Sequence, residues 1–241
     1  VIHIRFMKHL KEKGLNPIWR STRRELVELF NHNGFNSVCS FDKITFPKNS
    51  FWVYSLALPY YLDLKPEDLG TTPYLKTLPE YDEKWKWMKE DTQYKIGLFW
   101  QSSSGFEQNS FRSLELKELM NVLSGRNCSL YSLQTHSDNR DTQEYPEIKT
   151  SLSVKGREFA DTFSIIQNLD LVITSCSFVA HVAASLGKEV CVFTPIMEYY
   201  IWTSSTGKTH WYGDNVHIFR QQVPRKWNEP MKQFENFLNT K

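Results

Sequence analysis

Two kinds of hydrophobic segment alternate along the last two thirds of the chain. Short runs rich in hydrophobic residues, many of them β-branched or aromatic, occupy residues 96–100, 129–133, 171–173 and 189–193. Runs of this length are typical of strands that are buried in a parallel sheet. Between these runs, hydrophobic residues recur at helical spacing over residues 113–123, 161–169 and 178–186. The alternation predicts an α/β fold built on parallel strands.

The first third of the chain carries a weaker form of the same pattern. Hydrophobic residues at positions 2, 6 and 10 stand four apart and Gly14 follows them, which predicts a helix over residues 1–14. We predict strands over residues 16–20, 38–41 and 51–58, and a helix over residues 21–34. Pro59 is expected to end the last of these strands. A small α/β unit that begins with a helix therefore precedes the larger one.

Three further stretches complete the predicted organisation. Residues 64–78 form a proline-containing connector, which a helix over residues 82–90 follows, and residues 136–154 are polar enough to form a long loop. Residues 228–238 predict a helix with Met231, Phe234 and Leu238 on one face. We place the first domain at residues 1–91, the second at residues 92–225, and a C-terminal helix at residues 226–241.

Composition and charge narrow the class of protein. The 241 residues are 40% hydrophobic and 15% aromatic, which suffices for a full core, and the net charge of +2 argues against a nucleic-acid surface. The four cysteines show neither paired nor metal-ligand spacing, which is typical of reduced thiols in the cytosol. No hydrophobic run is long enough to cross a membrane. We expect a cytoplasmic protein, with the inner face of a membrane as an alternative location.

A polar turn follows the predicted strand at residues 171–173. It consists of Thr174, Ser175, Cys176 and Ser177, and a predicted helix comes directly after it. At the carboxyl end of a parallel strand and the amino end of a helix, unpaired N–H groups and the helix dipole favour an anion. The turn therefore predicts a site for the diphosphate of a nucleotide.

His181 lies four residues after Ser177, so the two share one side of the helix. Its imidazole is placed to donate a hydrogen bond to a phosphate oxygen. A packed histidine bound to a main-chain carbonyl is the alternative, and it is the commoner case for such a residue. A reactive Cys176 is a further alternative, because a helix amino end lowers a thiol pKa, but the sequence shows no base near it.

Two more polar residues are candidates on local grounds. Ser102 lies in a Ser/Gly loop after the strand at residues 96–100, where it is either a phosphate or sugar ligand or part of an ordinary loop. Arg112 stands at a predicted helix start, where it either pairs with a diphosphate or is solvated. We interpret Asp161 as a helix N-cap, and Trp202 and Tyr212 as core or as a lip over the base.

Together these segments resemble one known family. The stretch from Ile173 to Lys188 is similar to the donor-site signature of the heptosyltransferase-type glycosyltransferases of family 9, and most similar to the branch often fused to tetratricopeptide repeats. Other segments also match the family and occur in the same order as in its members. They are residues 95–100, 111–114, 130–134, 159–162, 199–202, 211–212 and 219–221. The resemblance is good from Lys95 to about Gln222 and is weaker but collinear before that.

The resemblance implies a GT-B type fold with two Rossmann-like domains, each with a parallel sheet. The family has a strand and a Gly-Asp turn before the helix that corresponds to residues 1–14. The resemblance therefore implies a first domain that lacks its first strand here. It also implies a final helix that crosses back to the first domain.

The same resemblance implies a glycosyltransferase that moves a hexosyl or heptosyl group from a nucleotide-diphosphate sugar, with inversion, to a hydroxyl of a glycan, lipid-linked glycan or protein. The implied donor-binding residues are Ser102, Arg112, Gln134, Ser175, Cys176, Ser177 and His181, with Gln134 placed to recognise the nucleoside. Many members carry an acidic residue where Cys176 stands, and the thiol removes a charge that would repel a diphosphate. No cofactor is implied. We name no catalytic base, because the family's base lies in the early loop that would precede Val1.

Motifs of other nucleotide enzymes are absent from the sequence. It contains no GxGxxG, which argues against a nicotinamide enzyme, and no GxxxxGK[ST], which excludes a P-loop. No DxD-like pair follows a predicted strand, so we expect transfer without a metal ion. Two alternatives stay open: a non-catalytic or incomplete nucleotide-sugar-binding module, and a nucleotide-sugar epimerase.

Overall fold

The computed structural model describes residues 1–69, 73–101, 109–134, 140–153, 155–197, 199–203 and 206–241. A six-stranded sheet dominates it, with all strands parallel and in the order β5-β4-β3-β6-β7-β8. Its strands are β3 (Tyr94–Phe99), β4 (Cys128–Ser132), β5 (Ile148–Lys149), β6 (Leu171–Ser175), β7 (Glu189–Thr194) and β8 (Val216–Arg220). The chain runs outward from β3 to β5 and then returns to β6, which is the order of a doubly wound α/β sheet. The predicted α/β class with parallel strands is confirmed.

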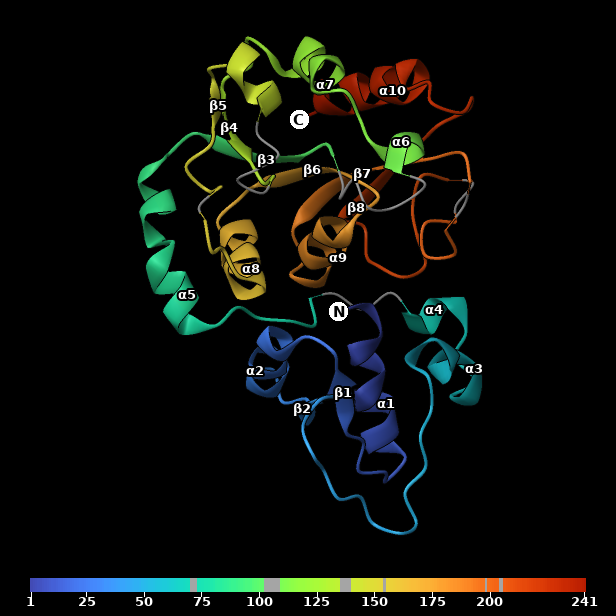
Figure 1. Ribbon diagram of the computed structural model, residues 1–241. Coiled ribbons are helices and arrows are strands. Elements are labelled where there is room, and N and C mark those ends of the chain that lie inside the picture. The colour runs from blue at the N-terminus through green and yellow to red at the C-terminus, as the bar shows by residue number, and fades with distance from the viewer. Residues whose placement is uncertain (70–72, 102–108, 135–139, 154, 198, 204–205) are drawn as a thin grey trace.

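Helices cover both faces of this sheet (Figure 1). Val172, Val190 and Val192 pack toward α8 (Phe159–Gln167) and α9 (Phe178–Ser185). The alternate residues Ile173 and Phe193 pack toward α7 (Leu116–Leu123) and α10 (Asn228–Leu238). Because successive side chains of a strand point to opposite faces, a strand covered on both sides must be hydrophobic throughout. This explains the short hydrophobic runs of the sequence.

Gly97 lies in the middle of β3, where the sheet is most tightly covered. A Cβ at this position would lie 2.4 Å from Cδ1 of Leu169 and 2.9 Å from Cδ1 of Leu133. The absence of a side chain therefore lets these two buried leucines reach the sheet.

The N-terminal part forms a smaller unit, which lies below the large sheet in Figure 1. It begins with η1 (Ile2–Phe6) and α1 (Met7–Glu12), and β1 (Trp19–Ser21) and β2 (Ser37–Cys39) pair in parallel with α2 (Arg24–His32) between them. Three further elements, η2 (Ser55–Ala57), α3 (Leu58–Tyr61) and α4 (Pro66–Leu69), complete it. The next elements are α5 (Pro79–Lys84) and η3 (Lys86–Glu90), and α5 lies beside the large unit, against α8 (Figure 1). Gly14 and Gly34 follow α1 and α2 with positive φ, as expected for glycines that end helices.

The predicted strand over residues 51–58 is wrong. These residues lead into η2 and α3, and Pro59 lies in the first turn of α3, a position that suits proline. Phe51 and Trp52 are 97% and 81% exposed, so the hydrophobic run is not buried between layers. A strand needs a partner for its main-chain groups, and none pairs with this segment in the described sheets.

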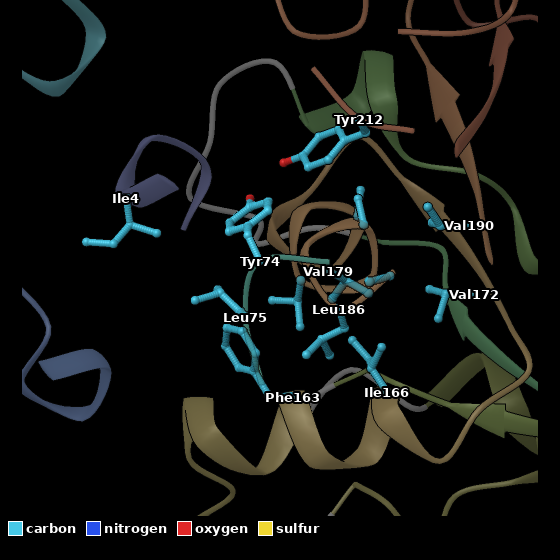
Figure 2. Close-up of a cluster of buried hydrophobic side chains, with 14 of the residues drawn as sticks. Ile4, Tyr74, Leu75, Phe163, Ile166, Val172, Val179, Leu186, Val190 and Tyr212 are labelled. Carbon is cyan, nitrogen blue, oxygen red and sulfur yellow. The ribbon is translucent and has the colours of Figure 1, made fainter. Parts of the chain in front are cut away.

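The two units share one buried cluster. Ile4, Tyr74 and Leu75 belong to the same buried cluster as Phe163 and Val179 of the large unit, and Leu75 lies beside these two side chains (Figure 2). The main-chain N–H groups of Tyr74 and Leu75 also donate hydrogen bonds to the carbonyl of Ser185, over 3.0 and 3.2 Å. The N-terminal unit is therefore packed directly onto the α8 and α9 face.

The C-terminal helix α10 lies on the opposite face of the sheet (Figure 1). Met231, Phe234 and Leu238 are buried there, as their spacing predicts. Its main packing partners are β8 and α7, with an added hydrogen bond of 2.8 Å from Arg126 Nη2 to Asn239 Oδ1. The main contacts of α10 are therefore within the large unit. The family resemblance implies instead a final helix that crosses back to the first domain.

Two local predictions need correction. Residues 136–154 contain η5 (Arg140–Glu144) and the edge strand β5 in their described part, so they do not form one long loop. Asp161 is not the N-cap of α8: Glu158 is, and Asp161 is its capping-box partner, accepting a hydrogen bond of 2.8 Å from the Glu158 N–H. Asp161 also accepts hydrogen bonds of 2.7 Å from Trp85 Nε1 and Lys84 Nζ, which satisfies its buried carboxylate.

No helix in the described ranges is long and apolar enough to cross a membrane.

Candidate functional site

The order of the strands reverses between β3 and β6, and the carboxyl ends of all six strands lie along one edge of the sheet. In open α/β sheets, ligands bind outside this edge at the reversal point. β3 leads into Trp100 and Gln101 there, and β6 ends at Ser175. The predicted polar turn therefore lies at the place where this architecture forms a binding crevice. Thr174 and Ser175 belong to the strand, so the turn itself is shorter than predicted.

Gln134 links the ends of β3 and β4. Its Nε2 donates a hydrogen bond of 2.9 Å to the carbonyl of Gln101, and its Oε1 accepts one of 3.3 Å from the Gln101 N–H. The side chain is fully buried. Both halves of the amide therefore hold the Gln101 main chain, which makes Gln134 a support of the crevice.

Ser177 and Thr174 interact with each other across the turn. Their hydroxyl oxygens lie 3.0 Å apart, and Thr174 Oγ1 also donates to the Ser175 carbonyl over 2.8 Å. Ser177 is the N-cap residue of α9, but its side chain makes no capping hydrogen bond. The N–H groups of the first turn of α9 therefore donate no hydrogen bond to the Ser177 side chain, so they are available to an anion at this helix N-terminus.

Cys176 is half-buried beside this turn, and its N–H donates a hydrogen bond of 2.9 Å to the Phe193 carbonyl. Burial raises the pKa of its thiol, with smaller opposing effects from Trp202 and Arg112. A protonated thiol is a weak nucleophile. The burial of the thiol therefore disfavours the reactive-thiol alternative.

Arg112 reaches the turn from the last residue of α6 (Asn109–Arg112). The predicted helix start at this residue is wrong, because α7 begins only at Leu116, and a cation at a helix end has no conflict with the dipole. Arg112 Nη1 donates a hydrogen bond of 3.2 Å to the Cys176 carbonyl. The guanidinium is therefore held directly beside the polar turn. Ser102, the remaining candidate from this region, lies outside the described residues.

Four buried polar atoms along the same edge have no hydrogen-bond partner among the described residues. They are Ser175 Oγ, Thr194 Oγ1, Gln221 Nε2 and Trp202 Nε1, the last of which faces the weakly accepting thiol of Cys176. Their residues are at most 2% exposed. Leaving a buried polar atom unsatisfied costs about 1–3 kcal/mol, so native proteins rarely do so without a functional reason. A ligand with hydrogen-bonding oxygens at this edge would supply such atoms with partners.

Sequence reasoning missed part of this set. Thr194 ends β7 and Gln221 follows β8, in the same way as Ser175 ends β6. A polar residue at the end of each buried parallel strand is a usable sequence signal once the strands are known. Trp202 carried no such signal, because an aromatic residue is most often packing.

His181 lies in the first half of α9, and its ring contacts the side chains of Tyr212 and Trp202. Its Nδ1 lies 2.9 Å from the Tyr212 hydroxyl, and its ring stacks on Trp202 with centroids 4.8 Å apart and planes 12° apart. Burial lowers the pKa of His181 to about 3, with a smaller contribution from the Arg5 cation. The imidazole is therefore neutral, with one nitrogen that donates and one that accepts.

A cavity of about 520 Å³ adjoins the edge next to Gln101. Its described lining is mixed and includes Ser110, Asp141, Arg225 and Trp227. This volume is in the range of small-molecule sites. Within the described part of the chain, no group of three or more His, Cys, Asp or Glu residues could hold a metal ion.

Comparisons with known proteins gave likenesses among solved structures. No protein-family model matches the chain, and no curated protein does. Among solved structures, the chain is similar to the crystal structure of the glycosyl transferase family 9 from Veillonella parvula DSM 2008, at 15% identity and a TM-score of 0.48. The match covers 99% of this chain and 72% of that chain.

Proposed function

We propose that the carboxyl edge of the large sheet binds the diphosphate of a nucleotide-diphosphate sugar, and that the protein is a glycosyltransferase. The observation that carries the proposal is the row of buried polar atoms without partners, Ser175 Oγ, Thr194 Oγ1, Trp202 Nε1 and Gln221 Nε2, along one edge. Two of these atoms belong to hydroxyl groups and two are N–H donors. All four can donate a hydrogen bond to a phosphate or sugar oxygen.

The charge around the edge favours an anion. Arg112 is held beside the turn by the Cys176 carbonyl, and Arg220 donates a hydrogen bond to the Trp202 carbonyl at the end of β8. The first turn of α9 adds its N–H groups and the positive end of its dipole. A guanidinium can bind a phosphate through two parallel hydrogen bonds.

The chemistry we propose is a single displacement. An acceptor hydroxyl oxygen bonds to the anomeric carbon while the bond from that carbon to the diphosphate breaks, so the configuration inverts. The diphosphate leaves with the electron pair, and a base on the acceptor side takes the hydroxyl proton. Arg112 and the α9 N–H groups would stabilise the leaving charge without a metal ion. Glycosyl transfer in particular is supported by the resemblance of residues 173–188 and the collinear segments to family 9.

Binding is tested by calorimetric titration of nucleoside diphosphates and their sugar conjugates against two variants. Ser175→Ala removes a buried hydroxyl that has no partner in the described part of the chain, and Ser129→Ala removes one at the amino end of β4 that bonds Gln93 and Lys149. We expect Ser175→Ala to weaken binding by about 1–3 kcal/mol and Ser129→Ala to leave it unchanged. Equal affinities for the parent and Ser175→Ala would remove Ser175 from the site.

Metal independence is tested separately, by measuring transfer with EDTA present and after adding Mn²⁺ or Mg²⁺. We expect no change. Transfer that stops with EDTA and returns with the metal would contradict the cation-only mechanism.

A second candidate is a nucleotide-sugar-binding protein without transferase activity. The observation in its favour is that His181, the histidine one helical turn from Ser177, has a pKa of about 3 and is too weak a base at neutral pH. Product analysis with bound donor and a panel of glycan and lipid-linked acceptors separates the two. Tight donor binding with neither transfer nor donor hydrolysis would favour the binding protein.

A further inference from the structure

We propose that Arg5, Tyr74 and Tyr212 are positioning residues that hold His181 as an Nε2–H hydrogen-bond donor toward the bound diphosphate. The proposal rests on the proposed function for its ligand. The arrangement of the four side chains is independent of that function. It joins the first helical turn of the chain to α9, two segments that only the tertiary structure brings together.

The first observation is how completely His181 is constrained. The Tyr212 hydroxyl occupies its Nδ1 at 2.9 Å, and Trp202 covers one ring face. The residue as a whole is still partly accessible. The ring therefore cannot turn over without breaking the Nδ1 contact, and its Nε2 edge is the one left for a ligand.

The second observation is a buried cation behind Tyr212. Arg5 is only 3% exposed, and its guanidinium lies 4.2 Å from the centre of the Tyr74 ring and 4.8 Å from that of Tyr212. Arg5 Nη2 donates a hydrogen bond of 3.1 Å to the Tyr74 hydroxyl. Its Nη1 donates to the carbonyls of Leu69 and Trp211, over 2.8 and 2.5 Å, so the guanidinium has a fixed position.

The cation decides which way the phenol hydrogens point. Oxygen lone pairs turn toward a neighbouring positive charge and O–H hydrogens turn away from it. The Tyr74 and Tyr212 hydroxyls lie close together (Figure 2). Burial is the largest effect on the pKa of each phenol and raises it. The Arg5 charge and the interaction between the two hydroxyls have smaller effects on both pKa values. Tyr212 therefore accepts on the side of Arg5 and donates its hydrogen to His181 Nδ1.

A neutral imidazole whose Nδ1 accepts must carry its proton on Nε2. The Tyr212 hydroxyl then donates to His181 Nδ1, and the Arg5 cation lies behind the Tyr212 ring. This bond polarises the imidazole, so the Nε2–H is a stronger donor than that of an isolated histidine. It is also a donor that costs little to bury, because the ring is uncharged.

The test combines one spectroscopic and one binding measurement on Tyr212→Phe. In protein with ¹⁵N-labelled histidine, long-range ¹H–¹⁵N spectra report which ring nitrogen of His181 carries the proton. We expect the Nε2–H form in the parent and a shift toward Nδ1–H in Tyr212→Phe. We expect affinity for a nucleoside diphosphate to fall about tenfold, the equivalent of one hydrogen bond.

Tyr200→Phe is the matched control. It removes a nearby tyrosine hydroxyl that lies 3.0 Å from His3 Nε2 and is not bonded to His181. A second pair of variants does not depend on Tyr212: the His181→Gln amide nitrogen lies near the Nε2 position, and the His181→Asn amide nitrogen near Nδ1. We expect Gln to retain more affinity than Asn.

Several outcomes would overturn the proposal. They are an unchanged Nε2–H form in Tyr212→Phe, a changed form with unchanged affinity, an equal loss in Tyr200→Phe, or a better-binding His181→Asn. If the parent binds no nucleoside diphosphate, the proposed function fails, and the spectra alone then decide whether Tyr212 sets the protonated nitrogen.

Discussion

Arg5 donates a hydrogen bond of 2.5 Å to the main-chain carbonyl of Trp211, which lies 206 positions later in the chain. This bond joins the first turn of the N-terminal unit to the segment that precedes β8. Tyr212, the neighbour of Trp211, contacts His181. The N-terminal unit therefore supports the candidate site through its packing, at a distance from the polar turn itself.

Arg5→Leu should destabilise the protein by about 3 kcal/mol, because it leaves two buried carbonyls and a buried phenol without their donor. Arg5→Lys should recover only part of the loss, because an ammonium group lacks the planar set of donors. Urea denaturation measures both. Arg24→Leu is the control, since that side chain is exposed in its ion pair with Asp42 and should change stability little. A similar, small loss for Arg5→Leu and Arg24→Leu would contradict the buried anchoring role.

Thr194→Val should leave the free protein as stable as the parent or more stable. The reason is that Thr194 Oγ1 is buried without a described partner, and removing such a group relieves a cost. Thr174→Val is the matched control, because Thr174 Oγ1 bonds the Ser175 carbonyl and lies 3.0 Å from Ser177 Oγ, and it should lose about 1 kcal/mol. Thermal unfolding with and without a nucleoside diphosphate checks this. The ligand-induced rise in Tm should shrink in Thr194→Val, and a full rise would exclude Thr194 from the site.

Arg112→Gln should weaken nucleoside diphosphate binding by about 1.5–3 kcal/mol, as expected for a hydrogen bond to a charged group. The parent's affinity should also fall with rising salt, and that dependence should be smaller in the variant. Arg126→Gln is the control, because Arg126 bonds Val122 and Asn239 away from the edge. Calorimetry at two salt concentrations gives both quantities. Equal losses in the two variants would show that the effect is not specific to the turn.

Gly97→Ala should destabilise the fold by about 1–3 kcal/mol, because its methyl group would meet the buried Leu169 and Leu133 side chains. The contact predicts a specific rescue. In a Leu169→Val background the shorter side chain makes room, so the same change should cost less. Denaturation of the four proteins of this cycle measures the coupling. Additive losses would mean that the clash with Leu169 is not the cause.

Acid should destabilise the protein before its carboxyl groups titrate. Burial lowers the pKa of His181 to about 3 and that of His3 to about 4, against an ordinary 6.5. Between these values the folded state binds fewer protons than the unfolded state. The free energy of unfolding therefore has its highest value above pH 6.5 and falls as the pH decreases toward 4. His181→Gln should flatten this dependence between pH 7 and pH 4.5, where carboxyl groups contribute little. His32→Gln, at an exposed position, should not.

The sequence by itself determined most of the large unit. A strand covered on both faces must be hydrophobic throughout, and a helix on the surface must be hydrophobic on one side. Continuous hydrophobic runs therefore locate β3, β4, β6 and β7, and helical spacing locates α10, each to within a few residues. The polar residues at the end of β6 were predictable for the same reason, since a strand must end where its hydrophobic run ends. The error at residues 51–58 has a matching cause. The run is hydrophobic, but only the structure shows that no strand pairs with it.

The tertiary structure alone decided which polar groups find partners. Gln134 was a predicted ligand, yet it is engaged by Gln101, 33 positions earlier, while Thr194 and Gln221 are buried with unsatisfied atoms. His181 is held by Tyr212 and Trp202, which no local pattern connects to it. Periodicity reports the face on which a residue lies. Hydrogen bonding depends on distances of about 3 Å between segments far apart in the chain, and these exist only after the strands are ordered and the N-terminal unit is packed against α9.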